Sequence, residues 1–395
     1  MSKDTIVIAA ARRTPVGAFQ GALSGASAPE LSSVASRAAI ADAGLAAGDI
    51  DEVLLGCVLP AGLGQAPARQ AAIGAGIPIG VPCTTVNKVC GSGMKTTMLG
   101  HDLVRAGTAT VVLTGGMESM TNAPYLMPKA RGGYRMGHQE ILDHMFFDGL
   151  QNPYDGNMMG HFGEETAQKY GFSREDQDAF AIESVTRARR AIDDGHFEAE
   201  IAPVTISTRK GDVTVSADEG PGKADIEKIP SLKPAFRKDG TVTAASSSSI
   251  SDGAASLLLL SESEAARRDI GILARIRGFS SFAQEPEWFT TSPVHAIRRL
   301  HKSLGWDVDD VDLYEVNEAF ACVTMAAMHD LGIPHEKINV NGGACAIGHP
   351  IGASGARIIV TLLHALRARG GGRGIASLCI GGGEATAIGI EVDAA

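Results

Sequence analysis

The sequence predicts an α/β protein of two repeated halves, with a long segment inserted into the first half. Three observations lead to this prediction: short apolar strands alternate with helical segments, several markers recur at one spacing, and residues 121–245 break the pattern. Such alternation is typical of α/β folds, so we expect mostly parallel strands with helices on the faces of the sheet.

The first elements carry recognisable start and stop signals. Residues 6–9 form a short apolar run of the buried-strand type. Residues 27–30 (Ser-Ala-Pro-Glu) combine an N-cap, an early proline and a glutamate three residues on, which indicates a helix start. Gly44 is a suitable residue to end that helix, and residues 49–56 follow as a second buried strand.

The same order of elements returns in the second half. A helix begins at Ser292-Pro293, ends at Gly305 and is followed by a strand over 308–316. In each half a glycine-rich turn then leads into a helix (94–105; 356–368) and a buried strand (109–114; 375–380).

Fixed spacings support a duplication. Three pairs of residues are separated by 261 positions: Gly44 and Gly305, Asp51 and Asp312, and Gly91 and Gly352. A fourth marker, the glycine cluster before Glu118 and before Glu384, is displaced by five residues. Four markers in unchanged order indicate two homologous halves, whose equivalent turns should lie close together across a pseudo-two-fold axis.

Residues 121–245 have a different character. Residues 121–157 are rich in Met, Gly, His and aromatic residues and are expected to be irregular, whereas residues 173–176 cap an amphipathic helix that runs to Ile192. Charged loops and short strands follow, and the core pattern resumes at 251–260. An insertion of this kind suits a lid or a substrate-binding element.

Length and composition restrict the function. A chain of 395 residues predicts two or three domains, and its net charge of −10 argues against nucleic acid as the main partner. The six cysteines contain no CxxC pair, and no second pair completes a metal site with Cys345 and His349, so we expect free thiols and no metal. The chain shows no signal-peptide pattern and no apolar run long enough for a membrane span, which predicts a cytoplasmic protein without membrane contact.

Cys90 is the leading candidate for a nucleophile. It lies between a β-branched run and a helical segment, and Gly91 and Gly93 follow it. A helix N-terminus lowers the pKa of a thiol, and the glycines allow positive φ and close approach of a substrate. The alternative is a buried structural cysteine, because free cysteine is among the most buried residues.

Three further residues could serve the same site. His349 lies in a glycine turn equivalent to that of Cys90, so the duplication predicts that the two are neighbours. Cys379 ends a buried strand before a glycine cluster, and Asn317 follows another buried strand. Each has a structural alternative: a satisfied histidine, a core cysteine and a turn cap, respectively.

Five motifs, in order along the whole chain, resemble those of the thiolases, and most closely those of the acetyl-CoA C-acetyltransferase group. They are Asn87-Lys-Val-Cys90-Gly-Ser-Gly-Met, Gly115-Gly-Met-Glu-Ser-Met120, Asn317-Glu-Ala-Phe-Ala321, Asn341-Gly-Gly-Ala-Cys-Ala-Ile-Gly-His349-Pro-Ile-Gly-Ala-Ser-Gly355 and Cys379-Ile-Gly-Gly-Gly383. The resemblance implies a five-layer α-β-α-β-α fold and a homotetramer. It divides the chain into an N-terminal half (1–120 with 246–270), a loop domain (121–245) for coenzyme A binding and oligomer contacts, and a C-terminal half (271–395).

The resemblance also implies roles for individual residues. Cys90 would be the acylated nucleophile, His349 would activate it, and Cys379 would be the acid and base at the substrate α-carbon. Asn317, through a water, would form one oxyanion hole with His349, and the amides of Cys90 and Gly381 would form the other. Ser248 would lie against the pantetheine arm of coenzyme A.

The implied reaction is the reversible Claisen condensation of two acetyl-CoA molecules to acetoacetyl-CoA and coenzyme A. Coenzyme A thioesters would be the substrates, with no covalently bound cofactor. Acyl transfer to a thiolate and attack by an enolate each place negative charge on a thioester oxygen, which explains a need for two sets of donors. Met158 stands where biosynthetic short-chain thiolases usually have histidine, and Phe289 stands where many bacterial members have methionine. These differences leave the preferred acyl length open, and both residues are candidate pocket residues.

Three rival functions remain open on the sequence. A 3-ketoacyl-CoA thiolase of broader chain length, acting in fatty-acid degradation, would share every motif. A decarboxylating ketosynthase would not need Cys379. An acyl-CoA-binding or scaffold subunit would never acetylate Cys90.

Overall fold

The computed structural model describes residues 4–394 and contains one large mixed sheet together with two small hairpins. The order of the large sheet is β12-β13-β14-β11-β1-β10-β5-β3-β4, and β2 pairs with β10. Its strands are β1 (Ile6–Arg13), β2 (Gly17–Ala18), β3 (Glu52–Gly56), β4 (Cys83–Val86), β5 (Val112–Ser119), β10 (Ser251–Ser261), β11 (Ala274–Ala283), β12 (Leu313–Val316), β13 (Gly372–Ile380) and β14 (Glu384–Val392).

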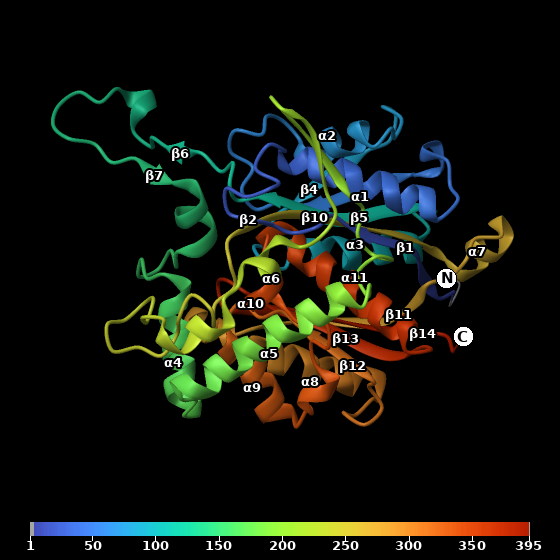
Figure 1. Cartoon of the computed structure of the whole chain (residues 1–395). Helices are drawn as coiled ribbons and strands as arrows, with labels where there is room; N and C mark the ends of the chain where they lie inside the picture. The colour runs from blue at the N-terminus through green and yellow to red at the C-terminus, as the bar shows by residue number, and fades with distance from the viewer. Residues whose placement is uncertain (1–3, 395) are drawn as a thin grey trace.

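Helices cover both halves of this sheet in layers (Figure 1). They are α1 (Ala28–Asp42), α2 (Pro67–Gly74), α3 (Ser92–Ala106), α7 (Glu262–Arg268), α8 (Ser292–Leu304), α9 (Ala321–Leu331), α10 (Ala344–Ile347) and α11 (Ile351–Ala368). Helices α1 and α2 cover the outer face of the first half, and α8 and α9 cover the outer face of the second. Helices α3 and α11 pack against each other and against strands of both halves, so they form the central layer. The expected five-layer arrangement of two repeated halves is confirmed.

The expectation of mostly parallel strands is wrong. Only β3 with β4, β3 with β5, and β12 with β13 are parallel among the pairs of the described sheet. The turn 381–383 is too short for the crossover that a parallel pair needs, so β13 and β14 must be antiparallel. Strand β10, which follows the insertion, enters antiparallel between β1 and β5.

Most element boundaries follow the sequence signals. The Ser27 side chain accepts a hydrogen bond from the Glu30 amide, and Glu30 in turn bonds the Ser27 amide, as a capping box requires. Ser173 and Asp176 repeat this arrangement at the start of α5. Gly305 adopts φ +67° immediately after α8. The strand expected over 109–114 begins and ends later in the structure, since β5 runs from Val112 to Ser119.

Residues 121–245 form short strands and helices together with α5, a helix of 20 residues. They are β6 (Tyr125–Leu126), β7 (Leu142–Asp143), a π-helix (Met145–Leu150), α4 (Met159–Tyr170), α5 (Arg174–Asp193), β8 (Val204–Thr208), β9 (Gly211–Val215) and α6 (Glu219–Lys223). The β6–β7 hairpin projects from the body of the molecule (Figure 1). The insertion is anchored on the fully buried Arg13 of β1, whose guanidinium bonds Glu200 at 2.5 Å and Asp218 at 2.7 Å.

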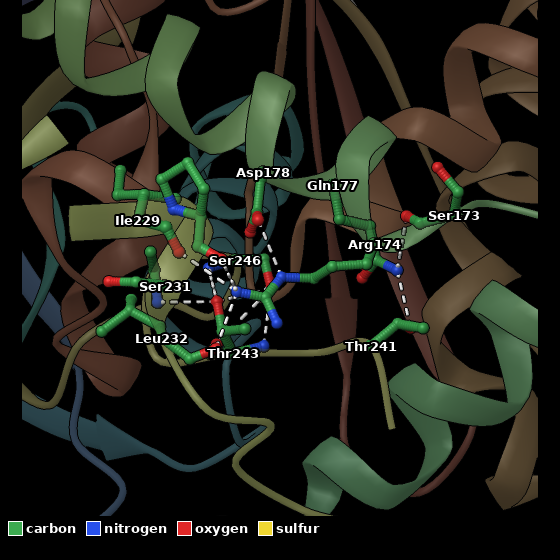
Figure 2. Close-up of polar contacts among 12 residues, drawn as sticks. Ser173, Arg174, Gln177, Asp178, Ile229, Ser231, Leu232, Thr241, Thr243 and Ser246 are labelled. Atoms are coloured by element: carbon green, nitrogen blue, oxygen red, sulfur yellow. Dashed lines mark hydrogen bonds and ion pairs between the residues drawn. The ribbon is translucent and has the colours of Figure 1, made fainter. Parts of the chain in front are cut away.

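The last part of the insertion is tied to α5 (Figure 2). Arg174 donates to Asp178 at 2.7 Å and to the carbonyl oxygen of Leu232 at 2.8 Å. Gln177 donates to the Thr241 hydroxyl at 2.9 Å. These contacts position residues 229–241, which lead directly into the serine-rich segment 246–249.

One helix among the described residues, α11, is long and apolar enough to cross a membrane, but 83% of it is buried inside the protein. This is the pattern of a core helix. Helix α3 and strands of the large sheet surround it.

Candidate active site

The turn that carries Cys90 is short and internally bonded. The Lys88 amide donates to the Ser92 hydroxyl at 2.8 Å, and that hydroxyl donates to the Val89 carbonyl at 2.7 Å. Val89 has φ +46°, a left-handed conformation that is uncommon for a β-branched residue and that occurs preferentially at functional sites. The turn therefore holds Cys90 at the entrance of α3 at some conformational cost.

The glycines after Cys90 act differently from the prediction. Gly91 has φ −79°, and positive φ is found at Val89 instead. A Cβ on Gly91 would lie 2.4 Å from the Ile380 side chain, and a Cβ on Gly93 would lie 2.8 Å from the Ala356 amide nitrogen. Glycine is therefore needed at positions 91 and 93 because the two halves approach each other closely, and not because the backbone adopts positive φ.

The predicted lowering of the Cys90 pKa is also wrong for this structure. Burial raises the pKa of the Cys90 thiol to about 11, although hydrogen bonds from the amides of Gly381 and of Cys90 itself act in the opposite direction. Loss of hydration outweighs the helix N-terminus. The resting group is therefore a neutral thiol, with two amides already directed at its sulfur.

The two equivalent helix entrances meet backbone to backbone. A Cβ on Gly355 of α11 would lie 2.4 Å from the Met94 amide nitrogen of α3, and a Cβ on Gly352 would lie 2.5 Å from the Met117 carbonyl oxygen. The buried Glu118 carboxyl fixes this contact, because it accepts bonds from the Gly352 amide at 2.9 Å and from the Val58 amide at 3.1 Å. Burial raises the pKa of Glu118 to about 7. The duplication thus brings the turns of Cys90 and His349 into one region.

His349 has one nitrogen satisfied and one free. It is 5% exposed, and its Nδ1 lies 2.6 Å from the Ser354 hydroxyl. That hydroxyl also lies 2.9 Å from the Pro350 carbonyl oxygen, and donation to this oxygen assigns the ring proton to Nδ1. Within residues 4–394 Nε2 has no hydrogen-bond partner, and burial lowers the pKa of His349 to about 3. The ring is a neutral imidazole whose Nε2 can accept a proton.

Asn317 and Cys379 are buried on the second half. Arg357 donates to the Asn317 Oδ1 at 3.4 Å, while Nδ2 of Asn317 is buried and lacks a partner in the described part of the chain. This amide is therefore the group left to donate to a water or ligand. Cys379 is fully buried at the end of β13, and burial together with nearby Cys90 raises its pKa well above the usual value.

An ion pair joins the two catalytic turns. The Lys88 ammonium, next to Val89 and Cys90, pairs with the Glu384 carboxylate that follows the glycine turn 381–383. This pair helps to keep the Gly381 amide beside the Cys90 sulfur.

A cavity of about 540 Å³ opens onto His349. Ser248 and Met158 line it, together with Met159, Phe236 and Phe320. Its wall is largely apolar, which suits an acyl group and a pantetheine arm.

Phe289 does not reach this cavity, contrary to the sequence prediction. It is 3% exposed and packs edge-to-face against Phe162 and Phe320, with ring centroids 6.3 and 6.5 Å apart. Phe320 lines the cavity, so Phe289 supports the wall from behind.

Several contributors were missed at the level of sequence. The repeat and the motifs contain Glu118, Glu384 and Ser354 without giving any of them a role, and Arg357 lies outside the motifs. A signal did exist for Ser354, because a serine five residues after a histidine at a helix entrance can reach its ring. No sequence signal points to Arg357 as the partner of Asn317. No group of three or more His, Cys, Asp or Glu side chains in residues 4–394 is arranged to hold a metal.

Comparison with known proteins identifies the family. Family models for the thiolase N-terminal and C-terminal domains match residues 6–263 and 270–392. The chain belongs to the thiolase family. The expected family and the expected enzyme class, an acyltransferase, are thereby confirmed.

Several full-length relatives of this thiolase are named acetyl-CoA acetyltransferase. This chain is 49% identical over 390 residues to an acetyl-CoA acetyltransferase of Pseudomonas aeruginosa, and the match covers 98% of this chain and 99% of the relative. It is 48% identical over 392 residues to acetyl-CoA acetyltransferase 1 of Arabidopsis thaliana, with 98% and 94% covered. The crystal structure of the Acat5 thiolase from Ascaris suum in complex with coenzyme A superposes with a TM-score of 0.94 at 40% identity, covering 98% of this chain and all of the other.

Proposed function

We propose that this thiolase is an acetyl-CoA C-acetyltransferase, which joins two acetyl-CoA molecules into acetoacetyl-CoA and coenzyme A through an acetyl group on Cys90. The names of its full-length relatives support the substrate. The main structural support is the free Nε2 of a neutral, buried His349, which lines the large cavity. A group in this state can accept a thiol proton.

In the first half-reaction, Nε2 of His349 takes the proton of the Cys90 thiol as the sulfur attacks the thioester carbonyl carbon. The carbonyl oxygen gains negative charge, which the amides of Cys90 and Gly381 stabilise. The bond to the coenzyme A sulfur then breaks, and the Cys379 thiol gives its proton to the leaving sulfur, so that a Cys379 thiolate and a His349 imidazolium remain. Losing one such donor typically costs on the order of 10²–10³ in rate.

In the second half-reaction, Cys379 acts as a thiolate and removes a proton from the methyl carbon of a second acetyl-CoA. The enolate oxygen receives hydrogen bonds from His349 and from a water held by Nδ2 of Asn317. The enolate carbon attacks acetyl-Cys90, acetoacetyl-CoA forms, and the Cys90 sulfur leaves. His349 gives its proton to the departing Cys90 sulfur, so that both thiols and the neutral imidazole are restored.

The parts around this centre have corresponding roles in the proposal. Ser248 lies against the pantetheine arm, and residues 121–245, between the halves formed by 1–120 with 246–270 and by 271–395, bind coenzyme A and contact neighbouring subunits. We further propose a cytoplasmic homotetramer. The projecting β6–β7 hairpin supports subunit contacts, because an exposed extension needs a partner surface to cover its apolar residues.

The test combines turnover with trapping of the intermediate. The enzyme should cleave acetoacetyl-CoA in the presence of coenzyme A, and mass spectrometry after incubation with acetyl-CoA alone should find acetyl on Cys90. A Cys379→Ser variant should still acetylate Cys90 but should not condense. Absence of the acetyl group would refute the enzyme mechanism in favour of a binding subunit, and a fully active Cys379→Ser variant would favour a ketosynthase.

A further inference from the structure

Arg357 is a charged side chain in the protein interior, next to one of the groups that the proposed condensation needs. It is 2% exposed and lies on α11, three residues after Ser354. Its Nη2 donates to Oδ1 of Asn317 at 3.4 Å, and its Nη1 lies 3.5 Å from the carboxylate of Glu315, which is equally buried. Burial raises the pKa of Glu315 to about 8. Buried ion pairs seldom stabilise a fold more than apolar residues of similar size do, so stability alone does not explain this arginine.

The side-chain amide of Asn317 depends on Arg357 for its orientation. The main chain here is held by other groups, because the Asn317 N–H donates to the Ser377 carbonyl at 3.0 Å and the Val316 N–H donates to the Asn339 side chain at 2.9 Å. Rotation about the last side-chain bond still exchanges Oδ1 and Nδ2 with little change in shape. A guanidinium has only donors, so the end of the amide that faces it is the acceptor Oδ1. Nδ2, which has no partner within residues 4–394, is thereby left to donate elsewhere.

Helix α11 contacts both groups that face the enolate oxygen in the proposed reaction. Ser354 bonds Nδ1 of His349 at 2.6 Å, and Arg357, three positions later and so on the same face of the helix, bonds Asn317. Burial and, to a smaller extent, the charge of Arg357 lower the pKa of His349 to about 3. Because burial is the larger cause, His349 stays neutral when Arg357 is removed. The orientation of Asn317 is therefore the property that changes most.

We propose that Arg357 is a positioning residue for the condensation step, which holds the Asn317 amide so that Nδ2 donates to the water that stabilises the enolate oxygen. The proposal rests on the proposed function, since it needs the second half-reaction. In the opposite orientation the Oδ1 of Asn317 would face that water and would leave the enolate without this donor. Acetylation of Cys90 uses the amides of Cys90 and Gly381 instead. The two half-reactions should therefore respond differently when Arg357 is replaced.

The experiment measures each half-reaction in a single turnover of the Arg357→Met, Glu315→Gln double variant, in which no buried carboxylate is left without its partner. Acetylation is followed by mass spectrometry of Cys90 after mixing with acetyl-CoA. Condensation is followed as acetoacetyl-CoA formed when acetyl-CoA is added to the isolated acetyl-enzyme. Loss of a hydrogen bond to a charged group should lower the condensation rate by roughly 10- to 150-fold. Acetylation should stay within about twofold of the unmodified enzyme, because its donors are unchanged.

Two controls separate orientation of Asn317 from a general loss of packing. Glu315→Gln alone keeps the bond from Arg357 to Asn317 and should retain most of the condensation rate. Thr361→Val removes the buried hydroxyl one turn after Arg357 on α11, and it should leave the ratio of the two half-reactions within about twofold.

A double-mutant cycle with Asn317→Ala completes the test. Once the amide is absent, replacing Arg357 should change the condensation rate by less than about twofold. Should the methionine variant fail to fold, Arg357→Lys replaces it in the same cycle: it keeps the charge but not the guanidinium geometry, so condensation should still fall more than acetylation. Equal losses in both half-reactions, or an undiminished effect in the Asn317→Ala background, would overturn the positioning role. Failure of the unmodified enzyme to acetylate Cys90 would instead overturn the proposed function.

Discussion

Ser354→Ala tests the assignment of His349 as a base. The Ser354 hydroxyl is the acceptor for the Nδ1 proton, at 2.6 Å, and this bond leaves Nε2 unprotonated. In the Ser354→Ala variant, the tautomer with its proton on Nδ1, which is the one that can act as a base at Nε2, would bury an unsatisfied N–H group, at a cost of about 1–3 kcal/mol. The population of the competent tautomer, and with it kcat/KM, should fall by roughly 5- to 150-fold.

The assay is thiolysis of acetoacetyl-CoA, combined with the rate at which acetyl-CoA labels Cys90. Ser354→Thr keeps the hydroxyl and should recover most of the loss. Thr361→Val, which removes another buried hydroxyl of α11 bonded to Glu200 at 3.0 Å, should lower stability without the same effect on labelling. Labelling by Ser354→Ala within twofold of the unmodified enzyme would refute the argument.

Three further predictions concern charge and pH. With a Cys90 pKa of about 11, only roughly one thiol in a thousand is ionised at pH 8, so inactivation by iodoacetamide should accelerate about tenfold per pH unit from pH 7 to 10; a plateau below pH 8 would contradict this. His349, with a pKa of about 3 against 6.5 unfolded, takes up a proton on unfolding below pH 6.5; unfolding by urea should lose roughly 2 kcal/mol of stability from this group by pH 5, and His349→Asn should remove that part. The side chains of Lys88 and Glu384 are partly exposed, so their interaction should contribute less than about 1 kcal/mol to the free energy of unfolding in a double-mutant cycle. A larger interaction energy would contradict this expectation.

The architecture could be predicted from the sequence because its signals are local and repeated. The caps at Ser27 and Ser173 and the glycine at 305 mark helix ends through their own backbone chemistry, and they appear where expected. Equal spacing of markers in two halves then predicted that the turns of Cys90 and His349 meet. In the structure the helices that follow these two turns are in contact, because Gly355 packs against Met94.

Strand direction and electrostatics could not be obtained in the same way. Whether β10 runs parallel or antiparallel to β5 depends on how the chain returns from the insertion, which no local pattern encodes. The pKa of Cys90 depends on how completely water is excluded, a property of both halves together. Phe289 failed as a pocket residue because one layer of side chains, Phe320, lies between it and the cavity.

The neutral resting state of Cys90 and His349 follows from their burial and suits a reversible reaction. If Cys90 and His349 formed a thiolate–imidazolium pair in this site, both ions would lose their hydration. Their mutual attraction alone would have to offset that free-energy cost, which is rarely achieved by buried ion pairs. In the free enzyme the amides of Cys90 and Gly381 offset the effect of burial on the Cys90 thiol only in part, and they stabilise the negative charge that develops on the carbonyl oxygen during the reaction. Charge separation is therefore favourable in the transition state and unfavourable in the free enzyme, for condensation and for cleavage alike. This difference lowers the barrier in both directions, because binding that strengthens only in the transition state is what accelerates a reaction.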